Sequence, residues 1–148
     1  MSDPVQHDIA ACSRAWQTLR IAHNRVAHRL DDELARACAL SINEFDVLLY
    51  LHSHVAEAVR LTALLQAVAL SQPALSRLIA RLEARGLLAR SEADDDGRAI
   101  VLCLTAPGTA LIDRATRIHA QVVREMLTSK FTETEQAALL QTLSQIGS

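Results

Sequence analysis

Aromatic residues are scarce in this chain of 148 residues, which has one tryptophan, one tyrosine and two phenylalanines. Glycine and proline are also few, four and three respectively, so the sequence supplies few sharp turns. Half of the residues are nevertheless hydrophobic, and the apolar mass is therefore aliphatic. This composition favours helices over a β-sandwich and excludes a disordered or collagen-like chain. The length suits one ordinary domain.

Cysteine is rare as well, with three residues at wide spacings and no CxxC pair. An odd number at such spacings fits neither a disulfide framework nor a zinc cluster. We therefore expect three reduced, mostly buried thiols at Cys12, Cys38 and Cys103.

Long hydrophobic runs are missing, since no apolar stretch approaches the roughly 18 residues that a membrane span needs. The first residues also lack the basic and apolar regions of a signal peptide. We therefore expect a cytoplasmic protein with no membrane partner. Lysine occurs only at Lys130, and the formal net charge is -2. This balance argues against coating nucleic acid by bulk charge, so any nucleic-acid contact must be local.

The first helical signal is long and begins at Asp3 and Pro4, which suit the first positions of a helix. Apolar residues follow at spacings of three, four or seven, which predicts an amphipathic helix reaching about Ala39. Its stripe contains Ile9, Cys12, Trp16, Leu19, Val26, Leu30 and Leu34. A small domain seldom covers so long a helix, so part of this stripe is expected to pack on another chain.

Capping signals divide the next stretch into short helices. Ser41 and Glu44 have the spacing of a capping box and predict the start of a second helix. A third, short helix is predicted with Thr62 as its cap. Ser71 is the predicted cap of a fourth helix. This helix is expected to end at Gly86, because glycine readily adopts the left-handed backbone conformation that commonly follows the last turn of a helix. Two short helices joined by a few residues make a helix-turn-helix candidate.

After Gly86 the apolar period changes from that of a helix to that of a strand. The segments 88–92 and 100–104 alternate, and the polar residues 94–97 between them predict a β-hairpin. Further helices are predicted after Thr105, and after a second capping box formed by Thr132 and Glu135.

The whole pattern predicts a mainly α fold with a small β-hairpin wing, a winged helix-turn-helix with N- and C-terminal dimerisation helices. We expect one domain over residues 1–148. Its dimerisation lobe covers about 1–40 and 106–148, and its winged helix-turn-helix lobe covers about 41–105.

Basic charge is concentrated where a recognition helix would lie, because residues 71–90 hold four arginines and one acid. Glutamine and arginine can read adenine and guanine in the major groove, and arginines further along meet phosphate. The helical spacing predicts DNA contacts from Ser71, Gln72, Pro73, Ser76, Arg77 and Arg81. The alternative interpretation is a solvated arginine face.

The hairpin tip adds a further cation, because Asp96, Gly97 and Arg98 form its predicted turn. A guanidinium on such a wing can enter the narrow minor groove beside the helix. Of the three neighbouring acids, Asp96 is the simplest candidate to brace Arg98 by a charge-assisted hydrogen bond.

The segments LSQPALSRLIARLEARGLLAR (70–90) and DDDGRAIVLCLTAPG (94–108) resemble the winged helix-turn-helix of MarR-type bacterial transcription regulators. The resemblance covers nearly the whole chain and includes the long first helix and the segment 43–48. It implies a homodimer whose terminal helices interlock and whose lobes bind a palindromic double-stranded DNA operator in adjacent major grooves. Such regulators usually repress transcription and are often released by a small phenolic or lipophilic ligand, a metal or an oxidant.

The same resemblance implies a small-molecule effector site between the dimer helices and the winged lobe. The candidate ligand-binding residues are Trp16, His23, Asp46 and Tyr50. Trp16 and Asp46 resemble positions used by the urate-responsive branch of the family. The alternatives are that Trp16 is a core residue and that Asp46 is a local helix cap or salt-bridge partner.

Other functions are weighed on single residues. Cys12 early in the first helix suggests a thiol-based redox-sensing repressor, against which stands a purely structural thiol. His52, His54 and His119 lack the spacing of a metal site and are expected at the surface. No phosphate-binding loop or nucleophile with a base is found, so we expect neither an enzyme nor a cofactor. A winged-helix interaction module that does not bind DNA is the remaining alternative.

Overall fold

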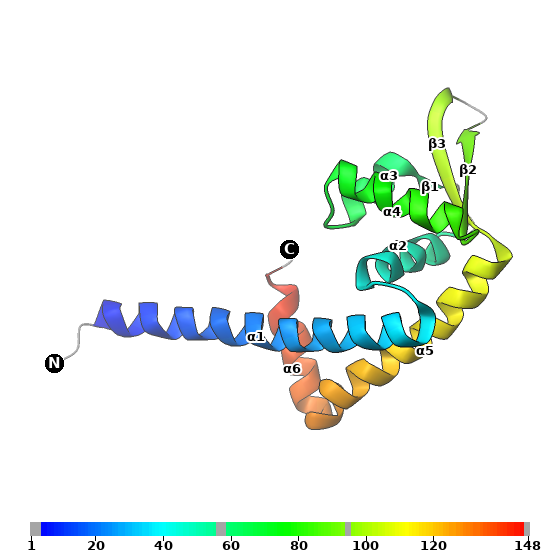
Figure 1. Cartoon of the computed structure of the whole chain (residues 1–148). Coiled ribbons are helices and arrows are strands. Elements are labelled where there is room, and N and C mark those ends of the chain that lie inside the picture. Colours follow the sequence, from blue (N-terminus) through cyan, green and yellow to red (C-terminus); the bar gives the residue numbers. More distant parts are fainter. Residues whose placement is uncertain (1–3, 56–58, 94–95, 147–148) are drawn as a thin grey trace. The chain divides into compact units, whose positions relative to one another are not determined.

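The computed structural model describes residues 4–55, 59–93 and 96–146. It is mainly helical and carries one small antiparallel sheet, so the predicted fold class is confirmed (Figure 1). The helices are α1 (Pro4–Cys38), α2 (Ile42–Ser53), α3 (Leu61–Ala67), α4 (Gln72–Ala84), α5 (Ala106–Met126) and α6 (Glu133–Ser144). A single 3-10 turn, Thr128–Lys130, precedes α6, and the strands are β1 (Val59–Arg60), β2 (Leu88–Ala93) and β3 (Asp96–Leu104).

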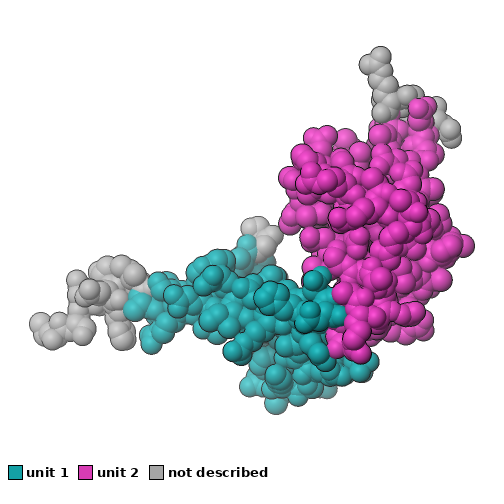
Figure 2. Space-filling view, in the orientation of Figure 1, with its two compact units in different colours: residues 1–32, 121–148 teal, residues 33–120 magenta. Residues whose placement is uncertain are grey.

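The chain forms two compact units (Figure 2). One unit comprises residues 33–120 and holds α2, α3, α4 and the sheet; the other comprises residues 1–32 and 121–148. Both boundaries fall inside helices, α1 and α5. The division into lobes at residues 40 and 105 stays a prediction.

The sheet has the strand order β1-β3-β2 with both pairs antiparallel. The predicted hairpin is present, with Leu88 opposite Leu104. Strand β1 was not predicted, and it pairs Val59 with Leu102. The expectation that Thr62 caps the third helix is wrong: α3 begins at Leu61 and its N-cap is Arg60, which makes no side-chain capping bond. Strand pairing fixes where the chain leaves β1, and the helix therefore starts at once.

The apolar faces predicted for the helix-turn-helix lie in the core of the 33–120 unit. Burying each such side chain contributes about 1.5–3 kcal/mol relative to leaving it exposed. On α4 the buried residues are Leu75, Leu78, Ile79 and Leu82, and they pack with residues of α2, α3 and the sheet. This packing presents the opposite face of α4 to solvent.

Local signals set most helix ends as expected. Both predicted capping boxes form, at Ser41 with Glu44 and at Thr132 with Glu135. Gly86 adopts φ +69° after α4, in the left-handed region that glycine tolerates best. The end of α1 uses the same conformation at Ala39, with φ 52°, where the sequence offers no glycine.

The junction between the wing and α5 is tightly built. The Thr105 hydroxyl donates to the carbonyl oxygen of Gly86 over 2.6 Å and accepts from the N–H of Gly108 over 3.1 Å. An added Cβ at Gly108 would lie 1.9 Å from the carbonyl oxygen of Leu87. Glycine is therefore required here by close approach of two backbones.

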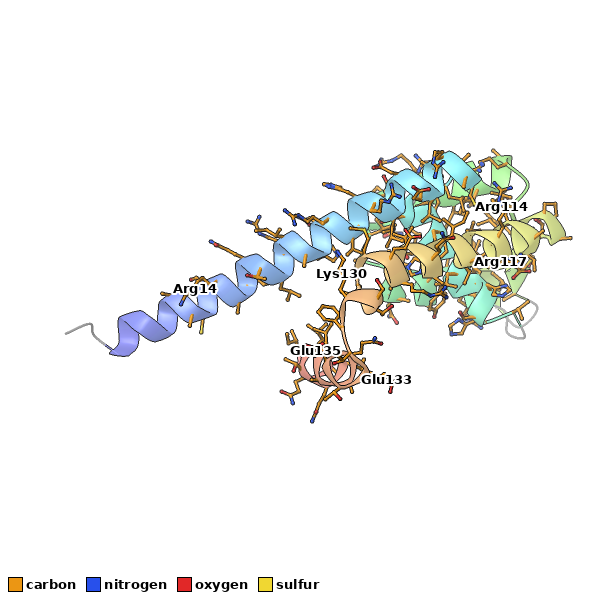
Figure 3. The ribbon with its side chains drawn as sticks, turned by 90° about the horizontal axis from the view of Figure 1, so that it is seen from below. Arg14, Arg114, Arg117, Lys130, Glu133 and Glu135 are labelled. Atoms are coloured by element: carbon orange, nitrogen blue, oxygen red, sulfur yellow. The ribbon has the colours of Figure 1, made fainter. Side chains whose placement is uncertain are left out.

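In the other unit, α6 begins with the acidic residues Glu133 and Glu135 in its first turn (Figure 3), where the helix dipole favours negative charge. Much of the apolar surface of this unit is uncovered in the single chain. Among the described residues, none of the helices alone combines the length and the hydropathy that a bilayer span needs; only α3 and α4 taken together would, and they are bent by 116° relative to each other.

The expectation of mostly buried thiols is wrong for two of the three cysteines. Cys38 is buried, whereas Cys12 and Cys103 are exposed. Cys12 lies on a part of α1 whose residues are exposed throughout, and Cys103 is exposed on β3 although its neighbours Val101 and Leu102 are buried.

Candidate nucleic-acid interface and ligand cavity

The exposed start of α4 carries the residues predicted to contact DNA. Ser71 caps the helix by accepting a hydrogen bond from the N–H of Ala74 over 3.4 Å, and Pro73 occupies its first turn. Gln72, Ser76 and Arg77 are exposed on the face opposite the buried leucines. Small and polar side chains on a helix N-terminus allow close approach to base edges.

The arginines of this region differ in their partners. The Nε atom of Arg81 lies 3.5 Å from Glu44 Oε1, and Nη1 of Arg85 lies 3.8 Å from Glu44 Oε2. Arg90 pairs with Glu83 over 2.9 Å. Arg77 forms no ion pair with any described residue. All four arginines are nevertheless exposed, so the alternative of a solvated arginine face stays open.

Glu44 links α2 to α4 and was foreseen only as a cap. Its carboxylate accepts a hydrogen bond from the Ser41 N–H over 2.9 Å, and its own N–H donates to the Ser41 hydroxyl over 3.2 Å. The residue is only 7% exposed although it is charged. Its pairing with α4 depends on the tertiary fold, and no local sequence signal announces it.

The wing enters the structure only in part. The backbone of β3 includes Asp96 and Arg98, but their side chains lie outside the described part, as do residues 94–95 altogether. The predicted bracing of Arg98 by Asp96, and its minor-groove contact, therefore stay predictions.

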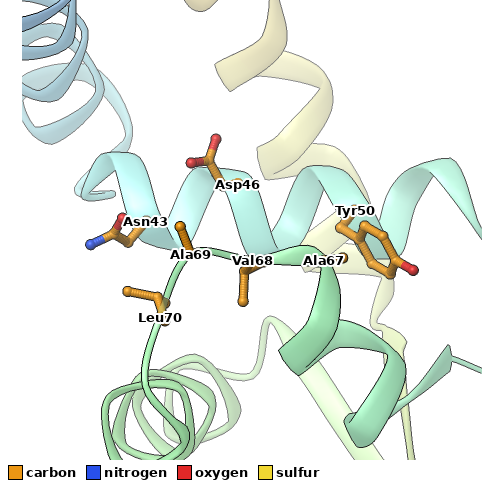
Figure 4. A pocket seen from close by; sticks show the side chains of 7 residues that line it. All are labelled: Asn43, Asp46, Tyr50, Ala67, Val68, Ala69 and Leu70. Carbon is orange, nitrogen blue, oxygen red and sulfur yellow. The ribbon is translucent and has the colours of Figure 1, made fainter. Parts of the chain in front are cut away.

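A cavity of about 300 Å³ lies between α2 and the turn that joins α3 to α4 (Figure 4). From α2 it is lined by Asn43, Asp46 and Tyr50, and from the turn by residues 67–70. Two of the predicted ligand-binding residues, Asp46 and Tyr50, thus line the same cavity. Asn43 was missed as a lining residue, although it shares one helical face with them at spacings of three and four.

The carboxyl group of Asp46, on α2, and the imidazole of His119, on α5, interact electrostatically. Burial raises the pKa of Asp46, while the nearby His119 lowers it by a smaller amount. Burial lowers the pKa of His119, and Asp46 partly opposes that effect. The His119 ring stacks on Phe45 with ring centroids 4.9 Å apart. His119 is thus half-buried and not fully at the surface, because α5 packs its ring against α2.

The other two histidines lie half-buried at the C-terminal end of α2. His54 stacks on Tyr50 at 4.3 Å, and its Nδ1 is 2.8 Å from the Tyr50 carbonyl oxygen. His52 Nε2 lies 3.5 Å from Asp113 Oδ1. Tyr50 is therefore held against His54 while it lines the cavity.

The remaining ligand-binding candidates belong to the other unit. Trp16 is 64% exposed, so the interpretation of Trp16 as a core residue of its own chain is wrong. His23 is exposed, and its Nδ1 lies 3.4 Å from the side-chain oxygen of Asn24. Their part in an effector site stays a prediction.

Comparison with known proteins gives consistent results. A model of the MarR family matches residues 40–99. The HTH-type transcriptional regulator PecS of Dickeya dadantii (strain 3937) is 31% identical over 116 residues, which make up 78% of this chain and 69% of PecS.

Solved structures agree in fold. Sco3205, a MarR family transcriptional regulator from Streptomyces coelicolor solved in complex with DNA, has a TM-score of 0.86 at 23% identity and covers 93% of this chain and 86% of its own. The transcriptional repressor CouR, bound to a 23-mer DNA duplex, has a TM-score of 0.79 at 27% identity, with coverage of 88% and 90% respectively. The mainly helical winged fold is thus shared over almost the whole length.

Proposed function

Because this chain belongs to the MarR family of transcription regulators, we propose that it is a ligand-responsive repressor that binds a palindromic operator as a homodimer. The observation that carries the DNA-binding part is the outer face of α4. Four of its leucine and isoleucine residues are buried, which fixes the helix, while Gln72, Ser76 and Arg77 are exposed together at its start.

These exposed residues suit readout in the major groove. Gln72 can make paired hydrogen bonds to adenine, and Arg77 is the arginine of α4 whose charge no described carboxylate engages. Ser71 and Pro73 bring the helix start close to the DNA, and the N–H groups there favour phosphate. Arg81 and Arg98 complete the proposed contact set at the backbone and in the minor groove.

The homodimer is supported by uncovered apolar surface in the unit of residues 1–32 and 121–148. Trp16, Ile21 and Leu140 are 64%, 50% and 72% exposed. A hollow of about 390 Å³ beside α6 is lined by Phe131, Leu140 and other apolar residues. Apolar surface of this kind marks an interaction site, and a second copy supplies matching surface by two-fold symmetry.

The proposed effector site includes the cavity between α2 and the α3–α4 turn. An occupant there touches both segments that position α4, so a ligand that prefers one arrangement of them changes DNA affinity. The lining holds a carboxyl, a hydroxyl and an amide from Asp46, Tyr50 and Asn43, and none of its described residues is a lysine or arginine. This favours a hydroxylated aromatic in its neutral form. A coupling of about 1–3 kcal/mol, or 5–150-fold in affinity, is typical.

Selection from a pool of random-sequence duplexes tests the DNA-binding proposal without knowledge of the operator. The wild-type protein is expected to enrich an inverted repeat with half-sites roughly 10 bp apart. Gln72→Ala and Ser76→Ala should change the preferred bases, whereas Arg98→Ala should weaken all duplexes alike and lower the salt slope by about 0.9. If nothing is enriched, the interaction module is the better interpretation.

The effector proposal is tested by the fluorescence of Trp16, the sole tryptophan, and by gel shifts of the selected duplex. Phenolic acids, urate, divalent metals and hydroperoxide are added in turn. A compound that changes both signals should lose its effect on DNA binding in Asp46→Asn or Tyr50→Phe. If hydroperoxide releases the protein from DNA and this effect is lost in Cys12→Ser, redox sensing is supported instead. If no compound changes either signal, the effector proposal is refuted.

A further inference from the structure

We infer that Glu44 is a positioning residue for DNA binding: it holds the guanidinium of Arg81 so that its terminal nitrogens face a phosphate. The inference rests on the proposed DNA-binding function. It adds a residue of α2, outside the recognition helix, to the determinants of affinity.

The geometry at Arg81 carries the inference. Its Nε atom lies 3.5 Å from Glu44 Oε1, while the side chain as a whole is 64% exposed. Among the described residues, no carboxylate other than Glu44 forms an ion pair with Arg81, and that contact lies at Nε, beside the two terminal nitrogens. A guanidinium held at Nε presents those nitrogens as a planar fork, which matches the oxygens of a phosphate.

The position of Glu44 is itself fixed from several sides. Its side chain is only 9% exposed, and the capping box with Ser41 fixes one of its oxygens at the start of α2. Arg85 approaches that same oxygen at 3.8 Å. A buried carboxylate is costly unless it is paired, so this one is anchored by its surroundings and can restrain a long, flexible side chain.

Simple electrostatics and the positioning role predict opposite results for Glu44→Gln. Removal of an acid near DNA ordinarily strengthens binding, because phosphate repulsion is relieved. If Glu44 positions Arg81, the same change should instead weaken operator binding about 3- to 10-fold and lower the salt slope by about 0.9, the loss of one phosphate contact. Glutamine at this position still completes a capping box, so α2 retains its start.

The experiment measures affinity for the selected duplex by fluorescence anisotropy at several salt concentrations. Glu83→Gln is the matched control, because Glu83 lies on α4 itself and its pair with Arg90 is solvent-exposed. This control should bind as well as wild type or better. The Glu44→Gln/Arg81→Ala double variant should bind no more weakly than Arg81→Ala alone, since Glu44 acts through Arg81.

Arg81→Lys gives a second measurement with Glu44 intact, in case Glu44→Gln fails to fold. Lysine keeps the positive charge but has a single side-chain nitrogen. That nitrogen cannot pair with Glu44 and at the same time offer a planar pair of donors to a phosphate. The expected result is a loss similar to that of Arg81→Ala. Wild-type affinity for Arg81→Lys, or tighter binding by folded Glu44→Gln, overturns the positioning role alone. Failure of the wild type to bind any duplex overturns both this inference and the proposed function.

Discussion

Substitution of Gly108 by alanine tests the packing that joins the wing to α5. The new Cβ would lie 1.9 Å from the carbonyl oxygen of Leu87, far inside the 3.0 Å that real Cβ atoms respect. The backbones of Leu87 and Gly108 are both hydrogen-bonded to Thr105. The Thr105 N–H donates to the Leu87 carbonyl oxygen over 3.2 Å, and the Gly108 N–H donates to the Thr105 hydroxyl over 3.1 Å. Relief therefore requires a shift of about 1 Å in one of them.

The expected cost combines overpacking, about 1–3 kcal/mol, with weakening of a hydrogen bond worth about 1 kcal/mol. Gly108→Ala should thus lower the free energy of unfolding by about 3 kcal/mol, read as a lower urea midpoint at constant slope. Gly86→Ala is the matched control: its Cβ meets nothing within 4 Å, and only the φ of +69° opposes it. That backbone strain costs about 1–2 kcal/mol. If Gly108→Ala is no more harmful than Gly86→Ala, the close approach to Leu87 is refuted.

Three further predictions concern pH, assembly and capping. Burial lowers the pKa of the His119 imidazole from its ordinary value of 6.5. The folded protein therefore binds this proton less readily than the unfolded chain does, and the free energy of unfolding decreases as the pH falls below 6.5. His119→Phe keeps an aromatic ring against Phe45, and its Tm should fall less than that of wild type between about pH 7.5 and 5.5; equal slopes would contradict this. Leu140→Glu places a charge on an exposed apolar face and should yield a monomer by light scattering, whereas an unchanged dimer mass would exclude α6 from the interface. Ser41→Ala removes the acceptor for the Glu44 N–H and should cost about 1 kcal/mol in urea unfolding; a cost near zero would show that the cap is dispensable.

Helix boundaries were predictable where a side chain determines them locally. Ser41, Ser71 and Thr132 cap their helices as their spacing predicts, because the capping bond reaches only two or three residues. Strand β1 could not be predicted, since a two-residue strand has no period and exists only through pairing with β3. Ala39 ends α1 in a left-handed conformation that sequence rules assign to glycine.

The candidate site divides in the same way. Exposure of Gln72, Ser76 and Arg77 follows from the helical period of α4, which the sequence displays. The engagement of Arg81 by Glu44 joins residues on separate helices, and a single sequence carries no signal for such a contact. The cavity likewise depends on how the α3–α4 turn lies against α2, so Asp46 and Tyr50 were predicted from resemblance and Asn43 was missed.

The central claim, a dimer that reads two half-sites with two copies of α4, is tested most directly by changing the spacing of the selected duplex. Insertion of half a helical turn, roughly 5 bp, turns one half-site to the opposite side of the DNA while leaving every base of both half-sites intact. The account predicts that affinity then falls to the level of a duplex with a single half-site. Unchanged affinity for the lengthened duplex would contradict it, because two recognition helices at a fixed separation cannot reach both sites.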